Sequence, residues 1–244
     1  MKLVLLGTGG FHPNERRHTA CVALPELGIA FDAGTSAFRL AERMRGRDLQ
    51  IFLTHAHLDH ICGLTFLLVP LMQNEIPSCK VHALPETLDA VRRHLFSQPI
   101  FPVLPRFDFV PLAERVELPG GVLTWTPLRH PGGSVGYRID LHNGRSMAYI
   151  TDTLADGSYT AFLRGVDVLV HECYFPDALA EWCEPTGHSH TSQVAKLARE
   201  SDVGRLYLTH IDPRRPDDDP VGLATARSIF PDTTLAEDLM EVEW

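Results

Sequence analysis

Short apolar segments alternate with amphipathic segments along most of the chain. The apolar segments are bounded by Gly, Pro, Asp or Asn, a pattern that is typical of buried strands. We expect strands at Lys2–Leu6, Thr19–Leu24, Ile29–Asp32, Leu49–Thr54, Lys80–Ala83, Val116–Leu118, Gly121–Leu128, Val135–Leu141, Ser146–Thr151, Asp167–His171 and Arg205–Thr209. The turn Pro25–Gly28 joins the second and third of these strands as a hairpin.

The amphipathic segments predict helices between the strands. They lie at Ser36–Arg45, Leu58–Met72, Glu86–Phe96, Thr191–Glu200 and Val221–Ser228. Thr35 is placed to cap the first helix, and Pro85 stands where proline favours the opening of the third. Residues 97–113 and the charged run 212–220 are expected to be loops. The first of these loops either borders a pocket or packs at the edge of the domain.

Strands and helices are interleaved in both halves of the chain, and no linker rich in Gly, Ser or Pro separates the halves. This order predicts an α/β fold with mixed sheets covered by helices. We expect a single domain over residues 1–244. The order of the strands within each sheet does not follow from the pattern.

Composition narrows the class of protein. Of the 244 residues, 44% are hydrophobic and 22% are charged, which excludes a disordered chain, a collagen and a coiled coil. A net charge of -9 argues against a protein whose whole surface binds a nucleic-acid backbone. The longest apolar run, Leu64–Met72, is too short to span a bilayer, and the amino terminus lacks a secretory apolar region. We therefore expect a cytoplasmic protein with no membrane partner.

The five cysteines are irregularly spaced and form no C-x-x-C motif. This excludes a disulfide framework and a zinc module built on cysteine. Free thiols in a reducing compartment are the expectation.

The histidines carry the chemistry that the composition does not. Among 13 of them, three fall within the motif THAHLDH at Thr54–His60, directly after an apolar strand. His55, His57 and Asp59 lie two residues apart, so in an extended segment they point to the same side. One catalytic zinc takes about three protein ligands, so this set suits two adjacent divalent cations better than one.

The HAHLDH motif resembles that of the metallo-β-lactamase superfamily. The resemblance implies a four-layer αββα sandwich, in which two mixed β-sheets are flanked by helices. It also implies three further ligands, each at the end of a strand. His130, Asp152 and His210 meet this requirement, since they follow the apolar strands VLTWTPL, SMAYIT and RLYLT.

The resemblance further implies two metal ions, each with three ligands of its own. The first ion takes His55, His57 and His130, and the second takes Asp59, His60 and His210. Asp152 bridges the two ions, which share a hydroxide as the nucleophile. Five imidazoles and one carboxylate besides the bridge suit zinc first, with manganese, iron or cobalt as alternatives. Asp32 is a candidate acceptor for one imidazole, or else an ordinary turn aspartate.

Four further segments resemble the ribonuclease Z-like branch of the superfamily. They are LGTGGFHPNERRHTA, HPGGSVGYRI, HECYF and GHSHTSQVAKLA. In that branch a His and a Glu are thought to protonate the leaving oxygen, and the matching positions are His188 and Glu172. Asp59 is also expected to be a catalytic residue. The alternative for His188 and Glu172 is that each side chain makes hydrogen bonds unrelated to catalysis. His171 and His190 receive no role.

One departure from the branch concerns its substrate. Only 22 residues separate His130 from Asp152, which leaves no room for the arm that holds tRNA in ribonuclease Z. Secreted lactamases differ, since they carry Arg where this chain has His60 and use a Cys ligand. Diiron flavoprotein relatives place Glu where this chain has His57.

We expect a hydrolase of a small or cyclic phosphodiester, with a small-molecule substrate and no large nucleic-acid partner. Hydrolysis of another ester by an arylsulfatase-like or lactonase-like enzyme is an alternative. So are a ribonuclease Z-type tRNA 3′ endonuclease and a catalytically silent metal-binding module. The resemblance alone suggests a homodimer.

Overall fold

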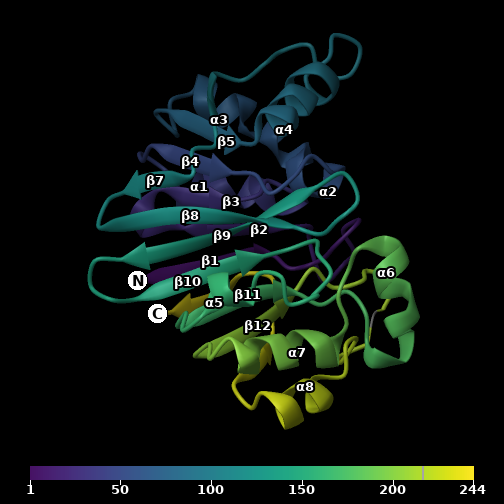
Figure 1. Ribbon diagram of the computed structural model, residues 1–244. Coiled ribbons are helices and arrows are strands. Elements are labelled where there is room, and N and C mark those ends of the chain that lie inside the picture. The colour runs from purple at the N-terminus through teal and green to yellow at the C-terminus, as the bar shows by residue number, and fades with distance from the viewer. Residues whose placement is uncertain (216) are drawn as a thin grey trace. The chain divides into compact units, whose positions relative to one another are not determined.

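The computed structural model describes residues 1–215 and 217–244 (Figure 1). The chain divides into two compact units. The first comprises Met1–Ala113 and Asp238–Glu243, and the second comprises Glu114–Glu237 and Trp244. Position 216 belongs to the predicted loop 212–220 and lies outside the described residues.

The first unit is built on a seven-stranded sheet in the order β14-β1-β2-β3-β4-β5-β6. Its strands are β1 (Lys2–Gly7), β2 (Cys21–Leu24), β3 (Ile29–Phe31), β4 (Leu49–Phe52), β5 (Cys79–Ala83), β6 (Phe107–Pro111) and β14 (Met240–Glu243). β14, β1, β2 and β3 pair antiparallel, whereas β3 to β6 pair parallel. The carboxyl ends of β3 and β4 therefore meet at one edge of the sheet.

Helices cover one face of this sheet. They are η2 (Thr35–Arg39), α1 (Leu40–Arg43), α2 (Leu58–Ile61), η3 (Cys62–Leu67), α3 (Leu68–Met72), α4 (Pro85–Ala90) and η4 (Val91–Leu95). Alternate strand residues such as Val4, Ile51 and Val81 share one apolar core with helical Leu40 and Leu64. Because strand side chains alternate between faces, this core uses only one side of each strand.

The second unit holds another seven-stranded sheet, in the order β13-β12-β11-β10-β9-β8-β7. Its strands are β7 (Arg115–Leu118), β8 (Gly121–Leu128), β9 (Ser134–Leu141), β10 (Ser146–Ile150), β11 (Val168–Glu172), β12 (Arg205–Thr209) and β13 (Thr233–Leu235). β7 to β10 pair antiparallel, and β10 to β13 pair parallel. The carboxyl ends of β10, β11 and β12 consequently lie together.

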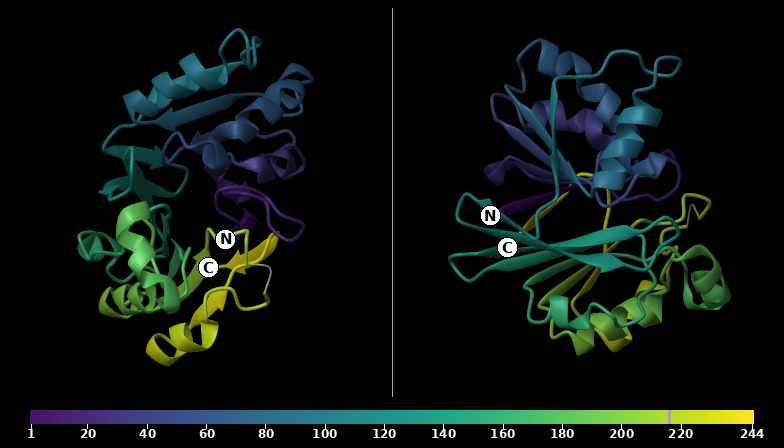
Figure 2. Two further views of the ribbon diagram at one scale, coloured as in Figure 1. Left: turned by 90° about the vertical axis from the view of Figure 1, so that its right-hand side faces the viewer. Right: turned by 45° about the horizontal axis from the view of Figure 1, so that its top comes forward.

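The helices of the second unit are α5 (Thr160–Leu163), η5 (Asp177–Trp182), α6 (Cys183–Thr186), α7 (Thr191–Glu200) and α8 (Leu223–Ile229). Val194 and Leu197 of α7 and Ala226 of α8 pack with Leu169 and Leu206 of the sheet in one apolar core. α7, in green, and α8, in yellow, lie on the same face of this sheet (Figure 2).

The predicted fold class, two mixed sheets flanked by helices, is confirmed. The hairpin of β2 and β3 is also present, with Gly28 in the left-handed region. Three strands were not predicted, namely β6, β13 and β14. Because β6 lies within 97–113, the prediction of a loop over all of this segment is wrong. All three lie at the edge of a sheet. Edge strands have fewer apolar positions than central ones, so their sequence pattern is weaker.

The helix predicted at Leu58–Met72 is interrupted, because the 3-10 helix η3 lies between α2 and α3. Within this segment the N–H of Gly63 donates to the carbonyl of Ala33 at 2.8 Å, outside the helix, and a Cβ at Gly63 would lie 2.1 Å from the carbonyl oxygen of Gly34. The prediction that Thr35 caps a helix is wrong. Gly34 occupies the cap position, and Thr35 instead accepts a hydrogen bond from the backbone N–H of Thr19, at 2.9 Å.

The five cysteines are free thiols, as expected, and four of them are buried. No helix of the described residues is long and apolar enough to cross a membrane. A single domain over residues 1–244 stays a prediction.

Candidate metal centre and proton donor

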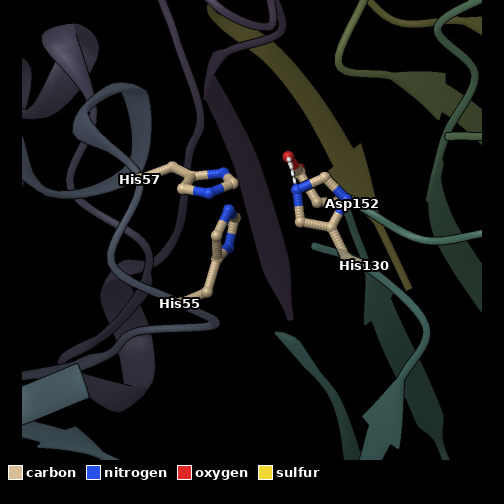
Figure 3. A group of neighbouring side chains, drawn as sticks. All are labelled: His55, His57, His130 and Asp152. Atoms are coloured by element: carbon tan, nitrogen blue, oxygen red, sulfur yellow. Dashed lines mark ion pairs between the residues drawn. The ribbon is translucent and has the colours of Figure 1, made fainter. Parts of the chain in front are cut away.

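The first unit gathers three imidazoles in the segment His55–His60, which comprises the turn after β4 and the start of α2. The rings of His55 and His57 lie 4.5 Å apart between centroids, and those of His55 and His60 lie 4.3 Å apart. Figure 3 shows His55 and His57 side by side on this turn. His57 has extended backbone angles directly before α2, so the expected same-side arrangement is present for His55 and His57. The expectation is wrong for Asp59, which lies in α2 and not in an extended segment.

Asp32 at the end of β3 orients this turn. Its Oδ2 lies 2.8 Å from Nδ1 of His60, and its Oδ1 accepts the N–H of Thr54 at 2.8 Å. The hydroxyl of Thr54 lies 3.0 Å from Nδ1 of His55. Each partner fixes one ring nitrogen and leaves Nε2 of the same ring to face a ligand, which is how metal-binding imidazoles are commonly oriented. The structure thus supports the ligand-orienting reading of Asp32.

Asp59 has a backbone partner in the same unit. Its Oδ2 accepts the N–H of Phe11 at 2.8 Å and lies 3.4 Å from Nε2 of His60. The carboxylate is therefore anchored by a loop far away in sequence.

The second unit places three candidate ligands after β8, β10 and β12. Nε2 of His130 lies 3.7 Å from Oδ2 of Asp152, and Nε2 of His210 lies 3.1 Å from Oδ1. The dashed line in Figure 3 marks the contact between His130 and Asp152. Each oxygen of Asp152 thus has its own imidazole. This arrangement is compatible with a carboxylate shared by two cations.

Two of these ligands have unusual backbones. Asp152 has φ 44° and His210 has φ 56°, and Asp32 in the first unit has φ 56°. Residues with a Cβ rarely adopt this left-handed region, and when they do they cluster at functional sites. The turn after each strand redirects the side chain at a conformational cost.

His130 is held as a neutral imidazole. Burial lowers its pKa, although the neighbouring Asp152 acts in the opposite direction. Its Nδ1 lies 3.0 Å from the carbonyl oxygen of Gly187, which accepts the ring N–H. Neutral imidazole is the form that binds a metal ion.

His188 and Glu172 form the pair that the sequence predicted. Nδ1 of His188 lies 2.9 Å from Oε1 of Glu172. The buried carboxylate also accepts the N–H groups of Thr153, at 2.7 Å, and Ser189, at 3.0 Å. Burial by itself raises the pKa of Glu172, but the adjacent His188 outweighs it and holds that pKa below its usual range.

His188 also lies in a cluster with two rings of the second unit, which are themselves 5.8 Å apart. Tyr174 lies 4.7 Å away at an interplanar angle of 17°, and His210 lies 5.4 Å away. Glu172, His188 and His210 each offer an atom within 4.8 Å of the others. Tyr174 was not singled out in the sequence, although it follows Glu172 by two residues within HECYF.

His171 and His190 have structural partners. His171 is buried, with Nε2 2.8 Å from the hydroxyl of Tyr159. His190 pairs with Asp177 at 2.8 Å. The strand alternation explains why Glu172 and His171 differ, since they point to opposite faces of β11.

A cavity of about 240 Å³ borders His130 within the second unit. Its lining consists of Arg129, His130, Pro131, Leu154, Glu184 and Gly187. Arg129 and Glu184 form an ion pair on its exposed wall. The cavity combines apolar and charged surface beside a candidate ligand, as substrate sites commonly do.

Comparison with known proteins decides the family. Residues 28–211 match the family described as Beta-lactamase superfamily domain. The fold is similar to that of a metallo-β-lactamase fold protein from Bacillus subtilis, with a TM-score of 0.82, 18% identity and coverage of 100% and 99% of the two chains. The chain belongs to the metallo-β-lactamase superfamily. It is a metal-dependent hydrolase of this superfamily, and its His and Asp clusters could bind metal.

Within the superfamily, the chain is similar to ribonuclease Z. The protein of that name from Bradyrhizobium sp. is 30% identical, over 97% of each chain. A diphosphatase of the PhnP family shares the fold, with a TM-score of 0.76, 22% identity and coverage of 100% of this chain and 96% of the other.

The alignment with the Bradyrhizobium protein runs over 298 positions, against 244 residues in this chain. The relative therefore carries segments that this superfamily member lacks. Between His130 and Asp152, the structure contains only β9, β10 and the turn that joins them. The expected absence of an arm in this interval is confirmed.

Proposed function

We propose that the chain binds two divalent metal ions and hydrolyses a small or cyclic phosphodiester. The observation that carries the proposal is Asp152, whose two oxygens lie beside His130 and His210. The proposal requires the His55–His60 turn of the first unit to serve the same ions. The two units would then act as one domain over residues 1–244.

The donor set fits the ions. His55, His57 and His130 would hold the first ion, Asp59, His60 and His210 the second, and Asp152 both. Asp32, Thr54 and the carbonyl of Gly187 each occupy one nitrogen of a ring, so the other can face a metal. Zinc is the first expectation for this set of nitrogen and oxygen donors, with manganese or iron as alternatives.

When bound, the two ions would lower the pKa of water towards neutrality and stabilise negative charge on the phosphate. The chain supplies the proton for the leaving oxygen. His188 would donate it from Nε2, while Glu172 accepts the Nδ1–H and stabilises the imidazolium. The stacked ring of Tyr174 keeps the imidazole in one orientation.

Turnover of bis-(p-nitrophenyl) phosphate tests the proposal. The protein is reconstituted separately with zinc and with manganese, its metal content is measured, and Asp152→Ala serves as the control. We expect metal-dependent hydrolysis that falls to background in the variant, together with weaker binding of both ions.

A protein that holds two ions and leaves phosphodiesters intact would contradict the proposal. Hydrolysis of an aryl sulfate or a lactone would then favour the second ester chemistry. Cleavage of a tRNA precursor, in preference to small diesters, would favour the alternative of a ribonuclease Z-type activity, the name that its Bradyrhizobium relative carries. The small-molecule substrate, the homodimer and the cytoplasmic location stay predictions.

A further inference from the structure

The glycine loop, residues 8–18, is anchored at both ends within the first unit. Asp238 accepts the N–H and the hydroxyl of Thr8, at 3.0 and 2.9 Å, and the N–H of His18 at 2.9 Å. Arg17 donates to the hydroxyl of Thr8 at 2.6 Å. The side chain of Asn14 accepts the N–H of Arg17 at 2.8 Å and closes the loop. The loop is thus pre-organised by its own hydrogen bonds.

Phe11 at the tip of this loop has a backbone that suits glycine better. Its φ is 61°, in the left-handed region that a side chain with a Cβ disfavours. The residue is 67% exposed, so burial of its side chain does not offset the conformational cost. A single exposed aromatic residue is common on protein surfaces. An exposed aromatic residue on a strained backbone is uncommon, and such strain points to function.

The position of Phe11 is tied to a proposed metal ligand. Its N–H donates to Oδ2 of Asp59 at 2.8 Å. Leu58, next to Asp59 in sequence, is 69% exposed. Two apolar side chains therefore accompany one candidate metal-binding carboxylate, and neither is used by the proposed chemistry.

We propose that the ring of Phe11 stacks on a nucleobase of the substrate, so that the phosphodiester is of nucleotide type. This inference rests on the proposed function. An aromatic face binds any base, and stacking supplies affinity that does not depend on charge. With a net charge of -9, the chain has little general attraction for phosphate, so a stacked base is an effective source of binding.

Binding of 5′-AMP and of ribose 5-phosphate to the metal-loaded protein tests the inference. The two ligands share the sugar phosphate and differ in the base, and calorimetry measures both. We expect AMP to bind about tenfold more tightly than ribose 5-phosphate, a typical value for one stacked base. Phe11→Gly should abolish this preference, and Phe11→Trp should retain it.

Leu239→Gly is the matched control. Leu239 is also apolar, 45% exposed and left-handed, with φ 66°, and its N–H binds the carbonyl of Leu5 at 2.7 Å. Glycine relieves the strain and keeps the N–H in both variants, so both should melt at a higher temperature than the parent protein. Only Phe11→Gly should change the preference for AMP.

Equal affinity of the parent protein for the two ligands, or no binding of either, would overturn the inference. So would an AMP preference that survives in Phe11→Gly. If Phe11→Gly loses bound metal, Phe11 is a positioning residue for Asp59 and the stacking role is wrong. These outcomes do not require turnover. A preference that depends on Phe11, without hydrolysis of any phosphodiester, would leave the nucleobase site standing and reject the proposed function.

Discussion

The two units present their candidate ligands in different ways. In the first unit, the ligands come from one turn, His55–His60, and side chains orient them. In the second unit, they come from the ends of separate strands, and a backbone carbonyl orients His130. The second unit also contains the His188–Glu172 pair. We propose that the first unit supplies metal ligands and the stacking ring of Phe11, whereas the second supplies metal ligands and the proton donor.

The largest effect should come from His188, the proposed proton donor of the second unit. His188→Ala should lower kcat by about 100- to 10,000-fold, because the leaving oxygen loses its acid. Bound metal should stay at the parental level, measured by elemental analysis. The loss should be smaller for a p-nitrophenolate leaving group than for a poorer one such as phenolate. Equal losses for both leaving groups would argue against a role as acid.

Asp32 of the first unit, which orients His60, should affect activity through metal binding. Asp32→Asn weakens the acceptor of the His60 Nδ1–H, so we expect metal affinity to fall by about 10- to 100-fold. Activity should return when the metal concentration is raised. Titration with a competing chelator measures the affinity. An unchanged affinity would mean that Asp32 only shapes the turn.

In the second unit, the group that orients His130 is the main-chain carbonyl of Gly187. It can be tested only by a substitution that shifts the backbone. Gly187 has φ 70°, and a Cβ there would lie 2.5 Å from Cδ of Pro131. Gly187→Ala should lower the free energy of unfolding by about 1–3 kcal/mol and also weaken metal binding.

Gly144→Ala is its control, since Gly144 has φ 86° but nothing within 4 Å of the Cβ position. Gly144→Ala should lower the free energy of unfolding by about 1 kcal/mol and leave metal binding intact. Denaturant unfolding and metal titration of both variants give the comparison. Equal effects on metal binding would contradict the role of the Gly187 carbonyl.

The smallest effect concerns stability in the first unit away from the ligands. Burial, aided by Lys80, lowers the pKa of His82 to about 4. The folded state therefore keeps His82 neutral while the unfolded state gains a proton below about pH 6.5. Stability should fall as the pH drops from 6.5 towards 4. His82→Phe keeps an aromatic ring against Phe52 and should lose less stability than the parent protein between pH 7.5 and 5.5, measured in urea.

The sequence predicts the candidate site residues better than it predicts the edge strands of the two sheets. HAHLDH is a local signal, and the apolar runs before His130, Asp152 and His210 indicate that these residues follow strands. The assignment of all seven ligands stays a prediction. The edge strand β6 was missed, since Pro and Phe residues surround it without a clear alternation.

Other features depend on contacts that no local pattern encodes. Where the helix is broken after Ile61, the N–H of Gly63 binds the carbonyl of Ala33, a position far away in sequence. The left-handed backbone of Phe11 has no signal at all, because phenylalanine does not favour it. The carbonyl of Gly187 as partner of His130 required the folded chain.

The strand β14 has a consequence for the order of events during synthesis. Residues Met240–Glu243 pair with residues 2–5, so β1 receives this neighbouring strand only after the intervening residues have been translated. Asp238, which anchors Thr8 and His18, arrives at the same stage. A nascent chain folding from its amino terminus must therefore hold β1 with an open edge, through translation of more than 200 residues. That interval is when the chain is most exposed to wrong strand pairing and has most to gain from a chaperone.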